Sequence, residues 1–230
     1  GHMQKLIMPF KRQMMLCGYK NSEYKRHWGY HHYGIDLSSI QGGVGKEHTV
    51  YASGSGEIVT VGPDNRVGNV IVVIYREVYN HKTGESRDLV ARYMHLESIA
   101  VRAGQKISQG DVLGVEGKSG MGGWDYHLHL EFDTDTAYPC YSPQVAGGTI
   151  LKKGTDSSVN PSDLLYVGEG QVVVDPTYNP AWLNSEDFTI PVLPKEAAVS
   201  RDEYEQLMAL YLAAKDKAER YDRIAAITKD

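Results

Sequence analysis

The stretch YHLHLEF, residues 126–132, decides the fold that we expect for this chain. Apolar and polar residues alternate through it and a glycine-rich segment precedes it, so it is predicted to be a β-strand. Successive side chains of a strand point to opposite faces, which places His127, His129 and Glu131 together and turns the leucines and Phe132 into a core. Two imidazoles about 7 Å apart on a rigid strand can supply a metal ligand and a proton-transfer group. Taken alone, the pattern also fits two exposed strand histidines.

The chain around this strand has the pattern of an all-β domain from residue 48 to 132. Residues 69–76 are rich in β-branched side chains, and the turn at 80–84 returns the chain as a hairpin into residues 89–95. Many short strands with glycine turns between them predict a mostly β fold, an antiparallel β-sandwich or barrel-like domain with a long C-terminal α-helix. Residues 24–33, dense in polar aromatics, are expected to form a loop.

The chain is expected to divide into one large domain and a C-terminal helix. Asn160 followed by Pro161 predicts a short helix that closes the domain. Four prolines between residues 175 and 195 are typical of a stiff linker. The expected parts are a cloning remnant at 1–3, a β domain at 4–168 with an insertion at 133–159, a linker at 169–195 and the helix at 196–230.

The C-terminal helix is expected to begin with a capping box formed by Ser200 and Glu203. Apolar or small residues then recur at alternating spacings of three and four, which is typical of a coiled-coil seam. Such a helix either pairs with a second copy in a homodimer or packs back on its own domain. The seam consists of Tyr204, Leu207, Tyr211, Ala214, Ala218, Tyr221 and Ala225.

Composition excludes two classes of partner. A net charge of -5 without a Lys/Arg-rich face argues against nucleic-acid binding. No apolar run is long enough for membrane insertion, and the run at 6–8 is too short for the core of a signal peptide. Cys17 and Cys140 are not spaced as a zinc pair, and they form either a disulfide or two free thiols.

A second polar cluster lies upstream, in His32-Tyr33-Gly34-Ile35-Asp36. Zinc enzymes commonly use three protein ligands drawn from His, Asp and Glu and leave the fourth position to water. His32 and Asp36 can reach one ion if the chain turns between them, and Gly34 eases that turn. A histidine of the 126–132 strand completes the set. From these residues alone, either His127 or His129 can be that ligand.

The order of these residues resembles a known family. His32 and Asp36, then Tyr93-Met94-His95-Leu96, then His127-Leu128-His129 resemble the lysostaphin-type (LytM-like) zinc endopeptidases, which cut peptidoglycan peptides. Residues 101–114, with two glycines, resemble that family's hairpin, and the resemblance covers residues 12–166. It implies that His32, Asp36 and His129 bind one Zn²⁺, that His95 and His127 are the catalytic pair, and that Glu131 supports the metal site.

The resemblance has gaps where the substrate groove is expected. Tyr126 stands where the family often has a small residue or proline, and Tyr19-Lys20 replaces a Gly-x-Arg ending. Trp28, Tyr30 and Trp124 are expected either to line the groove or only to pack. The other histidines, at positions 27, 31, 48 and 81, are interpreted as surface or loop residues.

The resemblance implies a zinc-dependent endopeptidase that hydrolyses peptidoglycan, at a stem peptide or a cross-bridge, outside the membrane in the cell wall. The chain is then a phage-type lysin or a domain of a larger exported protein. One alternative is a non-catalytic wall-binding or regulatory module, but such relatives usually lack a ligand or a catalytic histidine and none is missing here. A biotinyl- or lipoyl-type carrier is a third reading, and the lysine that it needs at a hairpin tip is absent.

Overall fold

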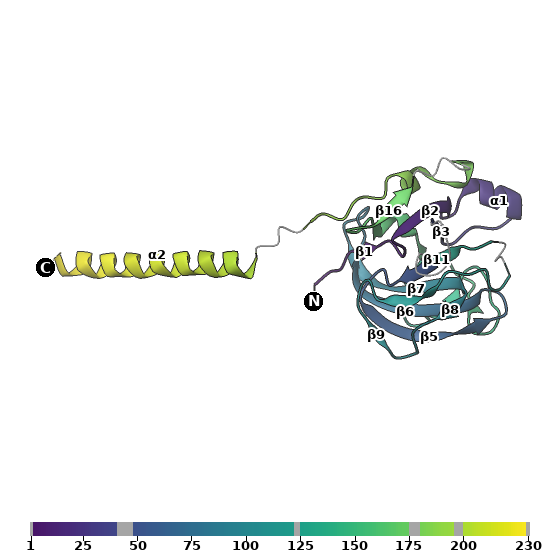
Figure 1. Ribbon diagram of the computed structural model, residues 1–230, viewed down its shortest axis with the longest axis horizontal. Helices are drawn as coiled ribbons and strands as arrows, with labels where there is room; N and C mark the ends of the chain where they lie inside the picture. The colour runs from purple at the N-terminus through teal and green to yellow at the C-terminus, as the bar shows by residue number, and fades with distance from the viewer. Residues whose placement is uncertain (1, 41–47, 122–124, 175–179, 196–199, 229–230) are drawn as a thin grey trace. The chain divides into compact units, whose positions relative to one another are not determined.

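One large, mainly antiparallel sheet forms the framework of the N-terminal part of the chain (Figure 1). The computed structural model describes residues 2–40, 48–121, 125–174, 180–195 and 200–228. It contains two units, Gly1–Leu193 and Pro194–Asp230. Within the described residues, the order of strands across the sheet is β16 (Val172–Val174), β2 (Arg12–Cys17), β3 (Ile35–Ser39), β11 (Leu128–Asp133), β7 (Ser86–Leu96), β6 (Gly68–Tyr79), β5 (Gly56–Asp64) and β9 (Lys106–Ile107).

Smaller sheets complete the first unit. β14 (Ser158–Val159) also pairs with β11, and β16 with β2 is a parallel pair in the large sheet. The remaining pairings join β4 (Thr49–Tyr51) to β10 (Val112–Val115), β10 to β8 (Ser98–Ile99), β1 (Leu6–Ile7) to β15 (Leu165–Tyr166), and β12 (Tyr141–Ser142) to β13 (Leu151–Lys152).

The main core lies between the large sheet and the sheet of β4, β10 and β8. Val50 and Leu113 from the small sheet belong to the same buried cluster as Leu128, Leu130 and Phe132 of β11. The alternation in residues 126–132 therefore predicted the buried face of β11 correctly. A second, smaller cluster, which includes Val72, Val90, Met94 and Ile150, lies on the opposite face of the large sheet. The expected fold class, a mostly β, antiparallel sandwich with a long C-terminal helix, is confirmed.

A short helix, α1 (Ser22–Trp28), stands where a loop was expected. The Asn21 side chain accepts a hydrogen bond from Tyr24 N at 3.1 Å and caps its start. Gly29, at φ 82°, ends it in the left-handed conformation that glycine adopts without strain. The helix has no buried residues. Because it lacks an apolar stripe, the hydrophobic pattern did not predict it.

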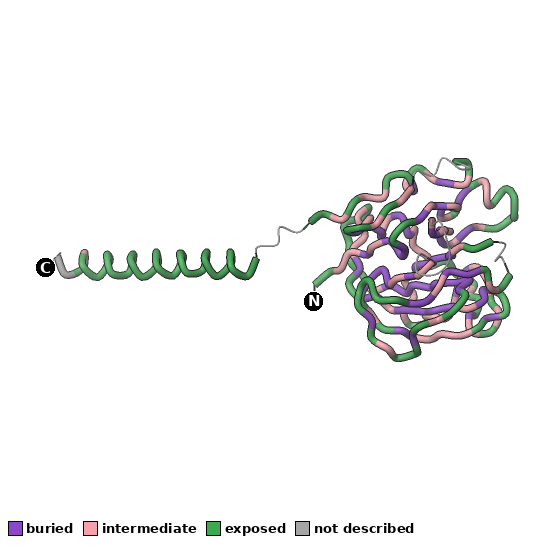
Figure 2. The backbone as a smooth tube through the Cα atoms, in the orientation of Figure 1, coloured by how far each residue is buried: buried purple, intermediate pink, exposed green. Residues whose placement is uncertain are grey.

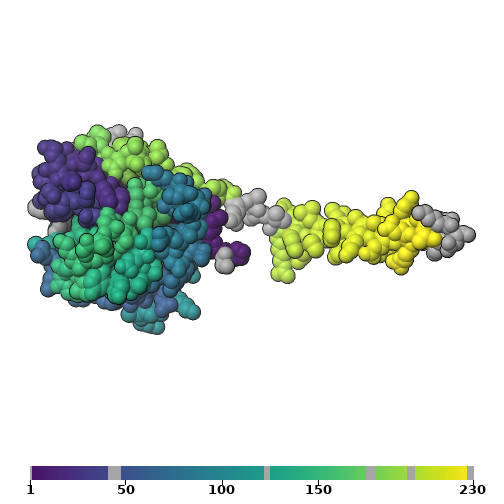
Figure 3. All heavy atoms as spheres, turned by 180° about the vertical axis from the view of Figure 1, so that it is seen from behind, coloured from purple at the N-terminus to yellow at the C-terminus, as the bar shows by residue number. Residues whose placement is uncertain are grey.

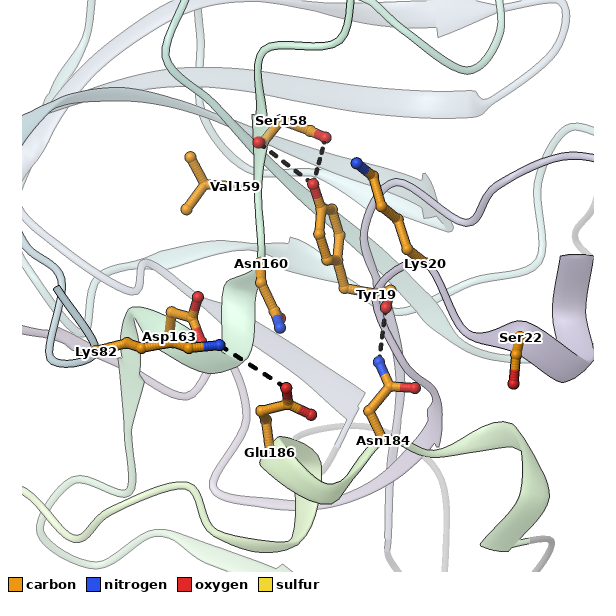
Figure 4. A pocket seen from close by; sticks show the side chains of 10 residues that line it. All are labelled: Tyr19, Lys20, Ser22, Lys82, Ser158, Val159, Asn160, Asp163, Asn184 and Glu186. Atoms are coloured by element: carbon orange, nitrogen blue, oxygen red, sulfur yellow. Dashed lines mark hydrogen bonds and ion pairs between the residues drawn. The ribbon is translucent and has the colours of Figure 1, made fainter.

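Much of the segment expected as a linker at 169–195 belongs to the first unit, which runs to Leu193. β16 pairs with β2, and Leu183 joins the main core. The Asn184 side chain donates a hydrogen bond of 2.6 Å to the carbonyl of Tyr19 (Figure 4). Two 3₁₀ turns, η3 (Pro180–Trp182) and η4 (Ser185–Phe188), lie here, and proline suits the first position of η3 because that residue needs no backbone donor. The described residues 180–193 therefore belong to the first unit.

The N-terminal residues and the residues near position 180 lie side by side on one face of the first unit (Figure 3). The rings of Tyr24 and Trp182 are 6.2 Å apart. The expected closing helix is a single 3₁₀ turn, η2 (Pro161–Asp163), whose cap Asn160 accepts a hydrogen bond from Ser162 N. The expected insertion at 133–159 carries the short strands β12, β13 and β14.

The second unit contains the expected helix, α2 (Arg201–Thr228). Its capping box is formed as predicted, because Ser200 Oγ accepts from Glu203 N at 3.1 Å and Glu203 Oε2 accepts from Ser200 N at 3.3 Å. The described side chains of the helix are exposed, apart from that of Ala225 (Figure 2). Among the described helices, none combines the length and the apolar character needed to cross a membrane.

Candidate metal and catalytic centre

A row of side chains crosses four neighbouring strands on the face of the sheet that turns away from the main core. In this row Asp36 of β3 stands opposite His129 of β11 on one side and opposite Cys17 of β2 on the other. Met94 of β7 stands opposite His129 and extends the row. Directly opposite residues of paired strands share a face and have Cβ atoms about 4.5–5.5 Å apart. Strand register therefore gathers these residues from segments that are far apart in the chain.

His32 reaches the row from the turn that leads into β3. Its Nδ1–H donates a hydrogen bond of 2.9 Å to the carbonyl of Gly18, and its backbone carbonyl accepts from Lys20 N. The side chain is buried, with the Tyr24 ring 4.6 Å from the imidazole. Because Nδ1 is engaged, Nε2 is the nitrogen available to the site.

Three ligand-type atoms converge at one point. His32 Nε2 lies 3.1 Å from His129 Nδ1 and 3.2 Å from Asp36 Oδ1, and His129 Nδ1 lies 2.9 Å from Asp36 Oδ1. A tetrahedral zinc ion, with bonds of about 2.0–2.2 Å to nitrogen and oxygen, holds neighbouring ligand atoms roughly 3.3 Å apart. The three residues therefore fit a divalent cation of this kind.

Gly34 permits this convergence. A Cβ atom at this position would lie 2.9 Å from His129 Nε2 and closer still to the carbonyl oxygen of Leu130. The chain between His32 and Asp36 therefore passes over β11 at a distance that only glycine allows. The sequence predicted that Gly34 would ease the turn, and the close approach to β11 is a further reason for glycine.

Behind His129 lies a buried charged cluster. His129 Nε2–H donates to Glu131 Oε1 at 3.1 Å, and Arg92 Nε donates to Glu131 Oε2 at 3.0 Å. Arg92 also binds Asp133 and donates to the carbonyl of Pro139 at 3.1 Å. Because the carboxylate of Glu131 is itself held on two sides, the ring of His129 has a fixed orientation with Nδ1 toward Asp36.

The electrostatics of this centre favour a cation. Burial lowers the pKa of His129, but hydrogen bonds to Asp36 and Glu131 outweigh it and raise that pKa to about 9. Burial raises the pKa of Glu131, but the hydrogen bond to His129 and the charge of Arg92 outweigh it and lower that pKa to about 2. Positive charge is therefore stabilised at the point where the ligand atoms meet.

His95 and His127 lie beside this point, with ring centroids 4.9 Å apart. His127 Nδ1–H donates to the carbonyl of Asp125 and His95 Nδ1–H donates to the carbonyl of Ser119, each at 2.8 Å. In both rings Nε2 is then the basic nitrogen. His127 Nε2 lies 3.9 Å from Asp36 Oδ1. Burial and the neighbouring charges of His127 and His129 lower the pKa of His95 to about 4, so its imidazole is neutral near pH 7.

His95 owes its position to an irregularity in β7. Ile71 pairs with Tyr93 and Asn69 pairs with Leu96, so Met94 and His95 together oppose one residue of β6. His95 has φ 64°, a left-handed conformation that is uncommon outside glycine. A bulge of this kind re-aims a side chain, and here it brings His95 to His127.

These positions fall in a segment with known relatives: residues 30–139 match the family model described as Peptidase family M23. This segment of the chain is similar to peptidase family M23. The resemblance stated from the sequence is therefore confirmed at the level of the family.

Two curated relatives each match this chain over 82 residues, 36% of its length. Peptidoglycan DD-endopeptidase ShyA of Vibrio cholerae is 34% identical, and the match covers 16% of its length. ShyB of the same organism is 30% identical, with 17% of its length covered. The matched part of the chain thus spans about a sixth of each relative. Among solved structures, the antimicrobial peptidase lysostaphin from Staphylococcus simulans is 26% identical, covers 54% of this chain and 43% of its own, and has a TM-score of 0.41.

Two of the residues expected to line a groove lie near His32. Trp28 and Tyr30 are exposed, and both rings contact Tyr24, which in turn lies against His32. Tyr24 therefore lies between these two rings and His32. Trp124 lies outside the described residues.

Two residues of this centre were not expected from the sequence. Arg92 was given no role within the predicted hairpin strand at 89–95, although its position two residues before Met94 puts it on the face that carries Glu131. Cys17 is the other. Both cysteines are free thiols, which settles the choice left open by the sequence. Burial, followed by the charges of Asp36 and Asp187, raises the pKa of the Cys17 thiol.

A separate polar hollow of about 570 Å³ opens beside Tyr19 and Lys20, shortly after the end of β2 (Figure 4). Its lining includes Tyr19, Lys20, Ser158 and Asn184, but none of the five histidine and aspartate residues of the centre. The Tyr19 hydroxyl lies 2.7 Å from Ser158 Oγ. This hollow is therefore distinct from the candidate metal site.

Proposed function

We propose that the protein is a zinc-dependent endopeptidase that hydrolyses peptide bonds of bacterial peptidoglycan. The observation that carries this proposal is the convergence of His32, Asp36 and His129 within 3.2 Å of one another, with His95 and His127 beside them. Similarity of this segment of the chain to peptidase family M23 supports the class of reaction.

His32 Nε2, His129 Nδ1 and Asp36 Oδ1 would hold one Zn²⁺, which when bound polarises a scissile carbonyl and lowers the pKa of water toward about 7. Three protein ligands leave a coordination position for solvent. Glu131 and the carbonyl of Gly18 keep the two imidazoles in the orientation that this requires.

His127 and His95 would transfer the proton of the attacking water and stabilise the negative charge that develops on the scissile carbonyl oxygen. Each ring has its Nδ1–H fixed on a backbone carbonyl, so each offers a basic Nε2. Either can accept the proton of the attacking water and return it to the leaving amine. The ring that has taken the proton on Nε2 would then be able to donate a hydrogen bond to the tetrahedral oxyanion. The low pKa of His95 keeps a second positive charge away from the cation site.

The substrate class rests on the relatives. ShyA and ShyB are named peptidoglycan DD-endopeptidases, and each matches this chain over 82 residues. We therefore place the substrate in the stem peptide or cross-bridge of the wall, and the site of action outside the membrane. The protein would act as a phage-type lysin or as part of a larger exported protein.

The helix α2 is proposed to dimerise the chain. The seam residues Leu207 and Tyr211 are 60% and 61% exposed, which leaves a coiled-coil face available to a second copy. Light scattering of the full chain should give twice the mass of one chain, and Leu207→Glu should give a monomer. A monomeric wild-type chain at high micromolar concentration would refute this part of the proposal.

The activity is tested with purified walls. The full chain with one equivalent of zinc should release new amino termini from purified sacculi, and mass spectrometry of the fragments identifies the bond that is cut. His127→Ala should retain zinc but lose release by a factor of about 10²–10⁴. His81→Ala is the matched control, because His81 contacts Leu165 away from the centre. Unchanged release by His127→Ala would favour a wall-binding module, and no release from any wall type would end the proposal.

A further inference from the structure

Cys17 stands next to the proposed zinc ligands and has no part in the activity described so far. It faces Asp36 directly across the β2–β3 ladder. One ligand atom each from Cys17, His32 and Asp36 lie within 4.8 Å of one another. The thiol is 5% exposed and is not in a disulfide. Cysteine, histidine and aspartate are the residue types that bind zinc in proteins.

A bulge in β2 is responsible for this position. Met15 pairs with Leu37, and the register then shifts so that Cys17, rather than Leu16, stands opposite Asp36. On a regular strand, Cys17 would share the face of Met15, which lies in the main core. The bulge instead places the thiol in the row of Asp36 and His129. Cys17 is accordingly absent from the main core cluster that contains Met15 and Leu37.

We propose that Cys17 is a fourth protein ligand that closes the metal site of the resting enzyme. This inference rests on the proposed zinc site. With Cys17, His32, Asp36 and His129 all bound, a tetrahedral ion has no position left for water, which is the arrangement of structural rather than catalytic zinc. Hydrolysis then requires Cys17 to leave, and the chain has an open and a closed form of one site.

The step balances without an oxidant. The thiol S–H bond breaks, an S–metal bond forms, and the proton passes to solvent. With a Zn–S distance of about 2.3 Å, sulfur and its neighbouring ligand atoms come to roughly 3.6 Å of one another. His32 Nε2 and Asp36 Oδ1 already lie 3.2 Å apart, so the thiol is the group that must approach, from within its present limit of 4.8 Å.

The match to the M23 family model gives no role to Cys17. Residues 30–139 match the M23 model, and Cys17 lies outside them. The thiol donates a weak hydrogen bond of 3.8 Å to the carbonyl of Gly18. Buried free cysteines commonly act as small apolar residues, but this one lies near the carboxylate of Asp36 and the imidazole of His32. Its surroundings match a ligand better than a packing residue.

Spectroscopy of the full chain tests the proposal. Cobalt(II) is the probe, because a thiolate ligand gives it an intense near-ultraviolet charge-transfer absorption that nitrogen and oxygen ligands do not give. X-ray absorption of the zinc form should show a sulfur neighbour at about 2.3 Å. Both signals should be lost in Cys17→Ser and kept in Cys140→Ser, the matched control at the other free thiol. Wall hydrolysis by Cys17→Ser should rise several-fold.

The outcomes separate the two proposals. A wild-type chain that binds one metal ion through nitrogen and oxygen alone overturns the role of Cys17, and the proposed endopeptidase stands. A chain that binds no metal removes the proposed zinc site as well. A sulfur signal that survives in Cys17→Ser also overturns the assignment. Because the wild-type spectra decide the first point, the test holds even if Cys17→Ser folds poorly.

Discussion

His129 and Glu131 share one face of β11, and Nε2 of the imidazole lies 3.1 Å from Oε1 of the carboxylate. The carboxylate fixes the ring so that the opposite nitrogen faces Asp36. Glu131→Gln keeps an oxygen at this place but removes the charge that makes the ring a stronger ligand. We expect zinc affinity to fall by about 10–100-fold.

Competition with a chromogenic chelator measures that affinity. Glu169→Gln, on an exposed residue far along the chain from β11, should bind zinc as the wild type does. Equal affinities for Glu131→Gln and the wild type would show that the carboxylate does not support His129. The buried carboxylate of Glu131 would then act as a partner of Arg92 and not as a support for His129.

Arg92 holds the buried charges together. Its guanidinium donates to Glu131 and Asp133, and all three side chains are almost fully buried. Arg92→Met keeps much of the side-chain volume but removes the buried positive charge that Glu131 and Asp133 share, leaving His129 and Lys153 as their charged partners. We expect the free energy of unfolding to fall by about 3–5 kcal/mol, measured by urea denaturation.

Arg76→Met is the matched control for this substitution. Arg76 pairs with Asp88 at 3.0 Å, but the two side chains are 64% and 39% exposed. Removal of an exposed pair changes the free energy of unfolding by about 1 kcal/mol or less. Similar losses in the two variants would contradict the claim that the Arg92 cluster supports the fold.

Asp64 should make stability depend on pH. Its Oδ1 accepts hydrogen bonds from Arg66 N at 2.7 Å and Val67 N at 3.0 Å, and its Oδ2 accepts from Ile150 N at 2.8 Å. Burial raises the pKa of Asp64, but these backbone hydrogen bonds outweigh it and lower that pKa. The stabilisation is therefore present above the unfolded pKa of about 3.9 and is lost as pH falls through the lower folded value.

Asp64→Asn isolates this contribution. At pH 7 the variant should be less stable than the wild type by about 1–2 kcal/mol, because the amide accepts fewer backbone hydrogen bonds. The difference should shrink as pH falls below about 4, where Asp64 of the unfolded wild type begins to be protonated, and toward the lower folded pKa. Thermal melts from pH 7 to pH 3 measure it. A difference that stays constant over this range would mean that Asp64 acts through shape alone.

The residues of the centre that the sequence predicted were found from local sequence patterns. His32 and Asp36 stand four residues apart around a glycine, and the strand that holds His129 alternates regularly. Neither pattern requires knowledge of how distant strands pair. The convergence of these residues was therefore expected, although residue chemistry alone did not separate the roles of His127 and His129.

The positions of Cys17 and His95 and the helix α1 were not predicted. The first two depend on β-bulges, and the helix has no apolar stripe. Cys17 opposes Asp36 only because β2 bulges at Leu16, and no alternation of apolar residues announces a bulge. The left-handed backbone of His95 has the same origin in β7. Helix α1 buries no residue, so the caps Asn21 and Gly29 were its only signals.

Gly34 offers a direct test of how tightly the metal site is built. Alanine at this position would place a Cβ 2.9 Å from His129 Nε2 and nearer to the carbonyl of Leu130, so the turn must lift away from β11. His32 and Asp36 flank that turn, and their distances to His129 would grow. We expect Gly34→Ala to weaken zinc binding by at least tenfold and to lower the melting temperature, as measured by chelator competition and calorimetry. Gly154→Ala is the control, since a Cβ there meets no atom within 4 Å. Unchanged zinc binding in Gly34→Ala would show that the ligands do not depend on the close approach of this turn to β11.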